Sequence, residues 1–118
     1  MRSWALVTGA TAGIGESFTR LLAANNYNLF LVARDLPRLH ERSTALQNAY
    51  GVETIVIQAD LSTNEGCALV ERYIAEHDID VLINNAGFGI KKAFTASALN
   101  DEQNLLDVLV RTPMRLMH

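Results

Sequence analysis

A glycine-rich segment near the amino terminus has the residue types that bind phosphate. Residues 8–15 are Thr-Gly-Ala-Thr-Ala-Gly-Ile-Gly, with the glycines spaced as GxxxGxG. Gly9 lets the chain turn sharply, Gly13 lets the backbone approach a phosphate, and Gly15 lets the next helix pack closely. That helix start presents unpaired N–H groups and partial positive charge, to which Thr11 adds a hydroxyl donor. Because the segment follows an apolar strand and opens a helix, it predicts a pyrophosphate site, the alternative being a ligand-free connection.

The residue after the second apolar segment indicates which dinucleotide this site would take. Arg34 stands where an acidic residue would bind a ribose 2′-hydroxyl and where an arginine accommodates a 2′-phosphate instead. This favours NADP. Asp35 is adjacent and keeps NAD open as the less favoured cofactor, and an ordinary exposed arginine at a strand end is the non-functional alternative.

Two further segments make the pattern specific. Asp60-Leu61 closes the third apolar strand, and Asn84-Asn85-Ala86-Gly87 closes the fourth. With the glycine segment, and in this order and spacing, they resemble the N-terminal motifs of the short-chain dehydrogenase/reductase family. The resemblance extends over nearly the whole chain and implies that residues 1–118 form a single NAD(P)-binding half-domain, truncated relative to complete family members.

The resemblance also implies contacts to the cofactor, residue by residue. Five residues would line the pyrophosphate: Gly9, Thr11, Ala12, Gly13 and Ile14. Arg34 would meet the 2′-phosphate, and Asp60 would hydrogen-bond the adenine amino group, with Leu61 beside it. Three residues would lie along the adenosine ribose and brace the central sheet: Asn84, Ala86 and Gly87.

The catalytic side chains that the resemblance implies are not found in this chain. Family members transfer hydride between the nicotinamide and a carbonyl or alcohol, with a tyrosine as acid/base and a lysine four residues later that lowers its pKa. None of the three tyrosines here is followed four positions later by lysine. In the segment 107–110, Leu109 takes the position of the family's catalytic asparagine. We therefore predict no catalytic residue and no hydride transfer by this chain alone.

The residues around these motifs predict the elements that position them. Apolar runs predict strands at 4–8, 28–33, 52–58 and 80–84, alternating with helices. Such alternation predicts an α/β fold, a Rossmann-like doubly wound parallel sheet of four strands in the order 3-2-1-4 with flanking helices. After an irregular stretch, a last apolar helix is expected to run to the C-terminus and to leave the edge of the fourth strand open. Its apolar residues are Leu105, Leu106, Leu109, Val110, Met114 and Met117.

Several helix details follow from the same patterns. The first helix should bury Ile14, Phe18, Leu21 and Leu22, and the second Leu39, Leu46 and Tyr50. Pro37 suits a first helical turn and Gly51 a helix end. Ser62 and Glu65 have the spacing of a capping box at the start of the third helix, within which Gly66 should cost about 1 kcal/mol relative to alanine.

Composition limits the remaining functions. A net charge of −3 disfavours nucleic-acid binding, and no apolar stretch approaches the ~20 residues of a membrane-spanning helix. The single cysteine, Cys67, fits a cytoplasmic protein, and the three scattered histidines make a metal site improbable. The apolar residues at 100–118 predict a homo-oligomer. Two alternatives stay open: a non-catalytic nucleotide-binding or interaction protein that dimerises through its C-terminal helix, and an enzyme completed by another chain.

Overall fold

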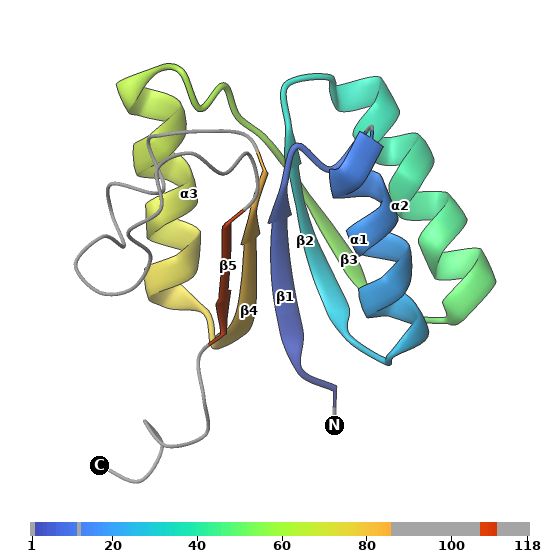
Figure 1. Ribbon diagram of the computed structural model, residues 1–118. Coiled ribbons are helices and arrows are strands. Elements are labelled where there is room, and N and C mark those ends of the chain that lie inside the picture. The colour runs from blue at the N-terminus through green and yellow to red at the C-terminus, as the bar shows by residue number, and fades with distance from the viewer. Residues whose placement is uncertain (1, 12, 86–106, 111–118) are drawn as a thin grey trace, which may run out of the picture.

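The computed structural model describes residues 2–11, 13–85 and 107–110. Strands and helices alternate along the chain and build one sheet of five strands in the order β3-β2-β1-β4-β5, with helices on both of its faces (Figure 1). The elements are β1 (Trp4–Thr8), α1 (Gly13–Ala24), β2 (Asn28–Ala33), α2 (Leu36–Tyr50), β3 (Thr54–Gln58), α3 (Asn64–Glu76), β4 (Ile79–Asn84) and β5 (Asp107–Val110).

The first four strands are parallel and have the predicted order 3-2-1-4. In the register of the sheet, Leu6 of β1 lies between Phe30 of β2 and Leu82 of β4. The carboxyl ends of these strands therefore meet at one edge, the edge at which α1 begins. Figure 1 shows α1 and α2 on one face of the sheet and α3 on the other, so the predicted doubly wound fold is confirmed.

The core is divided by the sheet into two layers. Because successive residues of a strand point to opposite faces, neighbours in β2 belong to different layers. Leu29 and Leu31 pack with residues of α1 and α2, whereas Phe30 and Val32 pack with residues of α3. Near-continuous apolar strands are thus buried on both faces, as in parallel sheets generally.

Helix α2 has the end signals that the sequence predicted. Pro37 lies in its first turn, and Gly51 ends it in the left-handed conformation, at φ 72°, with its N–H donating to the Gln47 carbonyl. The side chain of Asp35 caps the amino end by accepting a hydrogen bond, 3.2 Å long, from the Arg38 N–H. Proline suits the first turn because the backbone N–H that it lacks would have no partner within the helix there. Glycine suits the helix end because it adopts a positive φ angle without steric cost.

The buried faces of α1 and α2 are narrower than predicted. Leu22 is buried and Phe18 is half-buried, but the side chains of Ile14 and Leu21 are 52% and 56% exposed. Small residues occupy the contact with the sheet instead, among them Gly15 and Thr19, whose hydroxyl donates to the Glu16 carbonyl. The prediction for Ile14, Leu21 and the exposed Tyr50 was wrong because a closely seated helix buries only a narrow stripe.

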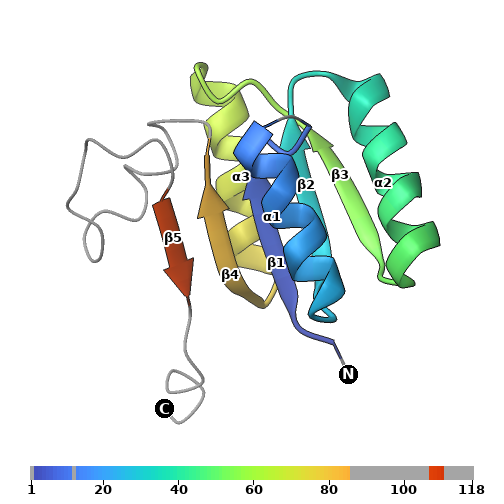
Figure 2. The same ribbon diagram turned by 45° about the vertical axis from the view of Figure 1, so that its right-hand side comes forward.

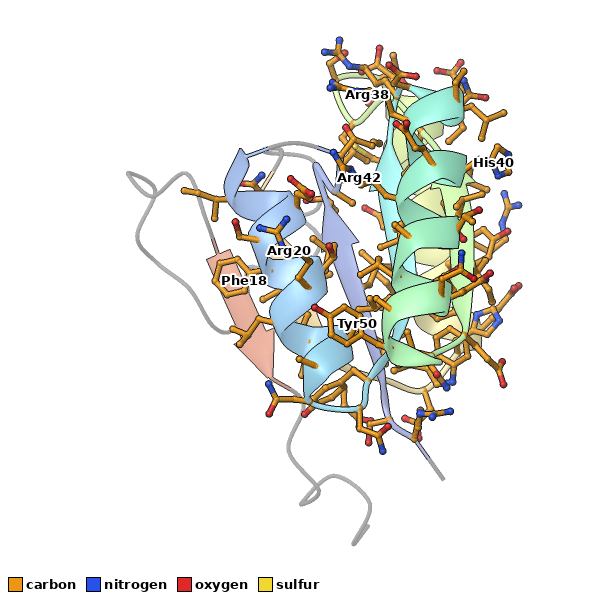
Figure 3. The ribbon with its side chains drawn as sticks, turned by 90° about the vertical axis from the view of Figure 1, so that its right-hand side faces the viewer. Phe18, Arg20, Arg38, His40, Arg42 and Tyr50 are labelled. Atoms are coloured by element: carbon orange, nitrogen blue, oxygen red, sulfur yellow. The ribbon has the colours of Figure 1, made fainter. Side chains whose placement is uncertain are left out.

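An ion-pair group joins α1 to α2 on their outer side. The Glu16 carboxylate lies 3.0 Å from Arg20 of the same helix and 2.8 Å from Arg42 of α2. Figure 3 shows Arg42 on the side of α2 toward α1, with His40 on the opposite side. Such partly exposed ion pairs add little to stability in water.

The cap of α3 is Thr63, not Ser62. Because the helix begins at Asn64, Thr63 is the flanking residue, and its hydroxyl accepts a hydrogen bond of 2.9 Å from the Gly66 N–H. The predicted cap is therefore wrong by one residue, and the Ser62 hydroxyl bonds the Asp60 carboxylate instead. Two strand boundaries also differ from the prediction, since β3 begins at Thr54 and β4 at Ile79.

The predicted final helix is wrong at residues 107–110. These residues form β5, which runs antiparallel to β4 with Leu109 opposite Leu82, at the end of the sheet (Figure 2). The edge of β4 offers a row of backbone N–H and C=O groups, and the β-branched Val108 and Val110 favour a strand that bonds to them. The prediction that β4 has an open edge is therefore also wrong for the residues of β4 that pair with β5. Four other residues of the predicted helix lie outside the described residues: Leu105, Leu106, Met114 and Met117.

Among the described residues, no helix has both the length and the apolar character that crossing a bilayer requires.

Candidate functional site

The glycine segment forms the turn between β1 and α1. Gly9 and Gly13 have φ angles of 64° and 62°, in the left-handed region where glycine is strongly preferred. A Cβ atom added to Gly15 would lie 2.0 Å from the Gly9 carbonyl oxygen. The predicted role of Gly15 in close packing of the helix is therefore confirmed. An added Cβ at Gly13 would meet no atom of the described, non-neighbouring residues within 4 Å.

The polar ends of β1 and β4 are tied together behind this turn. The buried Thr8 hydroxyl donates to the Asn84 side-chain oxygen at 3.0 Å and accepts from the Asn85 N–H at 2.8 Å. Asn84 thus braces the central strands, as the family resemblance implied. The Asn85 amide nitrogen lies 2.9 Å from an added Cβ on either Gly9 or Gly15, so this side chain closes over the turn.

A pocket of about 370 Å³ lies at the carboxyl ends of β1, β2 and β3. It is lined by Gly9, Thr11, Val32, Ala33, Arg34, Ala59, Asp60, Leu61 and Ser62. Loops at this edge of an open parallel sheet are where such folds bind ligands. The pocket brings together five residues predicted from the sequence for three different parts of a dinucleotide: Gly9, Thr11, Arg34, Asp60 and Leu61.

The other predicted site residues lie elsewhere. Gly13 and Ile14 are exposed at the start of α1, and Asn84 is 4% exposed in β4. Ala12, Ala86 and Gly87 lie outside the described residues. Five residues that line the pocket or cover the turn were not predicted from the sequence: Val32, Ala33, Ala59, Ser62 and Asn85. Their one common signal was position, since each lies at or just beyond the end of an apolar strand.

Arg34 and Asp35 differ in their availability to a ligand. Arg34 lines the pocket, and its carbonyl accepts a hydrogen bond of 3.2 Å from the Gln58 side chain at the end of β3. Asp35 is not among the pocket residues, and its carboxylate is engaged as the cap of α2. Arg34 is thus a residue of the pocket, whereas Asp35 lies outside the pocket lining and caps α2.

Asp60 is the negative group of the pocket. Its Oδ1 accepts from the Ser62 hydroxyl at 2.7 Å and from the Ser62 N–H at 2.9 Å. These two hydrogen bonds, in that order, are the main causes that lower the pKa of Asp60. Desolvation opposes them with a smaller effect, and the charge of Arg34 lowers the pKa by less still. The carboxylate is therefore ionised at neutral pH and can accept hydrogen bonds from a ligand.

Helix α3 supports the floor of the pocket through its thiol. The half-buried Cys67 donates from Sγ to the Leu61 carbonyl at 3.2 Å. Burial, followed by the charges of Glu71 and Asp60, raises the pKa of Cys67, so it stays a protonated donor.

No group of three or more potential metal ligands occurs in the described part of the chain. The arrangement as a whole offers one anion, one cation and small apolar walls, which suit a nucleotide base and a phosphate.

Comparison with known proteins agrees with this arrangement. The short chain dehydrogenase family matches residues 3–118. Among curated relatives, very-long-chain 3-oxoacyl-CoA reductase-A of Danio rerio is 31% identical over 91% of this chain and 34% of the relative. The chain spans about a third of the length of the relatives it matches.

Two solved structures share the fold. A short-chain dehydrogenase from Sphingobium yanoikuyae in complex with NADPH is 36% identical, with a TM-score of 0.66 over 68% of this chain and 32% of that one. L-sorbose reductase from Gluconobacter frateurii, complexed with NADPH and L-sorbose, is 32% identical, with a TM-score of 0.68 over 74% of this chain and 34% of that one. From its strand order, its glycine turn and the family match over nearly its full length, the chain belongs to the short-chain dehydrogenase family.

Proposed function

We propose that this chain binds NADP and is the cofactor-binding portion of a short-chain dehydrogenase/reductase. The observation that carries the proposal is the pocket at the sheet edge, which joins Arg34 and Asp60 beside the glycine turn. In the proposed complex, Asp60 accepts from the adenine amino group, with Leu61 beside the base. Arg34 meets the 2′-phosphate, and the pyrophosphate lies at the turn of residues 9–14. The NADPH found in the two similar structures supports this assignment.

The preference for NADP over NAD rests on the different settings of Arg34 and Asp35. An arginine pairs with phosphate through charge-assisted hydrogen bonds, whereas NAD recognition needs a carboxylate that is free to bind the ribose hydroxyls. Asp35 caps α2 and is not among the residues that line the pocket, whereas Arg34 is. This supports NADP as the cofactor.

The complete family reaction is hydride transfer between NADP(H) and a carbonyl or alcohol. We propose that the 118-residue chain by itself does not carry it out, because it has no tyrosine followed four residues later by lysine and has Leu109 at the family's asparagine position. A cytoplasmic location is likewise part of the proposal and has its support in the lone cysteine, Cys67.

The second candidate is a nucleotide-binding protein that acts by association with another chain. The apolar residues between 100 and 118 support a homo-oligomer. Since β5 pairs with the edge of β4, apolar side chains rather than that strand edge would form the contact.

Titration calorimetry with 2′,5′-adenosine diphosphate and with 5′-adenosine monophosphate tests the proposal. The wild-type chain should bind the 2′-phosphorylated nucleotide more tightly. Arg34→Asp should weaken that binding by about tenfold or more, because it replaces a charge-assisted hydrogen bond with repulsion. Arg38→Asp is the matched control: it makes the same charge change at an exposed position of α2 that does not line the pocket. Equal affinities of the wild type and Arg34→Asp for the 2′-phosphorylated nucleotide would contradict the role of Arg34.

A further inference from the structure

We propose that Ser62 is a positioning residue for adenine recognition: it orients the Asp60 carboxylate so that one oxygen is held by the protein and the other faces the base. This inference rests on the proposed nucleotide site and adds to it the residue that makes Asp60 selective. Ser62 lines the same pocket as Asp60 and lies two residues after it.

Both hydrogen bonds from Ser62 go to a single oxygen. The hydroxyl and the backbone N–H donate to Oδ1 of Asp60 at 2.7 Å and 2.9 Å. Within the described residues, the other oxygen, Oδ2, accepts no hydrogen bond. Two donors from one residue restrict the rotation that a surface carboxylate would otherwise have about its side-chain bonds, and they leave Oδ2 as the acceptor for a ligand.

The main chain of Asp60 is held independently of Ser62. Its carbonyl accepts from the Thr63 N–H at 3.1 Å and from the Thr63 hydroxyl at 2.8 Å. A Cβ added to Gly66 would lie 2.0 Å from the same carbonyl oxygen, so α3 presses against this turn. Because Thr63 and Gly66 place the backbone, the Ser62 hydroxyl can act on the carboxylate without being needed for the fold of the turn.

The Asp60 carboxylate distinguishes adenine from hypoxanthine by the group that the two bases have at the same position, an amino group in adenine and a carbonyl in hypoxanthine. An ionised carboxylate only accepts hydrogen bonds, so it attracts the amino group of adenine and repels the carbonyl that hypoxanthine has there. The Ser62 donors favour the ionised form. The other charged or titratable groups around Asp60 are Arg34, beyond β2, and Cys67 of α3, and neither donates a hydrogen bond to its carboxylate in the described structure.

The coupling between the two residues is tested without ligand, by NMR titration of the Asp60 carboxyl carbon. Ser62→Ala should raise the pKa of Asp60 toward its ordinary value, and Ser62→Thr, which keeps a hydroxyl, should restore it. Thr44→Ala, which removes a hydroxyl from an exposed site on α2, should leave it unchanged. If Ser62→Ala does not fold, Ser62→Cys, a weaker donor of similar size, should give an intermediate pKa. An unchanged pKa in either variant would overturn the inference.

The effect on recognition is tested with 2′,5′-adenosine diphosphate and its hypoxanthine counterpart, 2′,5′-inosine diphosphate. Ser62→Ala should weaken binding of the adenine nucleotide by about threefold to tenfold, the range of an ordinary net hydrogen bond, because Ser62 acts on the base only through Asp60. Binding of the hypoxanthine nucleotide should be unaffected. Equal weakening of both would show a merely structural role and overturn the inference. If the wild type binds neither nucleotide while the NMR coupling is present, the proposed function fails, and the adenine role of Ser62 fails with it.

Discussion

Asp60 is the residue at which the hydrogen bonds of the pocket converge. Ser62 holds its carboxylate, Thr63 holds its carbonyl, and the positive charge of Arg34 also lowers its pKa. A single short turn after β3 therefore serves both as the start of α3 and as the negative part of the site. Because protonation of the Asp60 carboxylate weakens its hydrogen bonds from Ser62, this turn is sensitive to pH.

The free energy of unfolding should depend on pH through Asp60. Because the pKa of Asp60 is lowered in the folded chain, the unfolded chain binds more protons in acid, and stability rises with pH. The contribution is fully present above the ordinary aspartate pKa and is lost as pH falls through the lowered one. In urea denaturation between about pH 5 and about pH 3, Asp60→Asn should therefore show a shallower loss of stability than the wild type. Thr44→Ala should keep the wild-type slope, and a wild-type slope in Asp60→Asn would contradict the assignment.

At the scale of elements, the contact between α3 and the turn after β3 changes the expected effect of a glycine. Helix propensity alone makes Gly66 unfavourable by about 1 kcal/mol relative to alanine. In the fold, however, an alanine Cβ would lie 2.0 Å from the Asp60 carbonyl oxygen, and the obstacle is backbone rather than a flexible side chain. Packing should therefore reverse the preference.

We expect Gly66→Ala to lower the free energy of unfolding by about 1–3 kcal/mol, as overpacked sites do. Urea denaturation followed by circular dichroism measures the change. Ala68→Gly, at an exposed position of the same helix, is the matched control and should cost about 1 kcal/mol through propensity alone. A Gly66→Ala variant more stable than the wild type would show that α3 can move away from the turn at little cost.

At the scale of the whole molecule, the described sheet has the pocket that contains Arg34 and Asp60 at one edge and β5 along the side of β4. We expect the purified chain to bind the nucleotide without reducing carbonyl compounds, because the family's tyrosine and lysine pair is not in its sequence. NADPH oxidation followed by absorbance, with aldehydes and ketones as substrates, measures this. NADPH turnover that disappears when Gly13 is replaced by a bulky residue would contradict the prediction, since it would locate catalysis in this chain.

The state of association is a separate expectation. Light scattering at micromolar concentration should give the mass of a dimer or a larger oligomer, because several large apolar side chains occur between residues 100 and 118. Replacing Met114 and Met117 by serine should shift the mass toward that of a monomer. A wild-type monomer under these conditions would contradict the proposed role of this segment.

The sequence by itself determined the order of the elements from β1 to β4 and five of the nine residues that line the pocket. Apolar runs followed by glycine, arginine or aspartate showed where the parallel strands end, and strand ends of a doubly wound sheet meet at one edge. Gly9 and Arg34 were found for this reason, whereas the role of Asp60 came from the family resemblance. The helix ends at Pro37 and Gly51 followed from the backbone preferences of proline and glycine. Such features are local, since each depends on the backbone preference or the chemistry of a few neighbouring residues.

Only the tertiary structure decided the features that depend on contacts between segments. Whether Ser62 caps α3 or binds Asp60 depends on where the helix starts, and a shift of one residue changes its partner. Likewise, the apolar segment at 107–110 is compatible with helix or strand, and pairing with the edge of β4 selects the strand. The close approach of Gly66 to Asp60 leaves no trace in composition or periodicity, because it is a distance between two backbones.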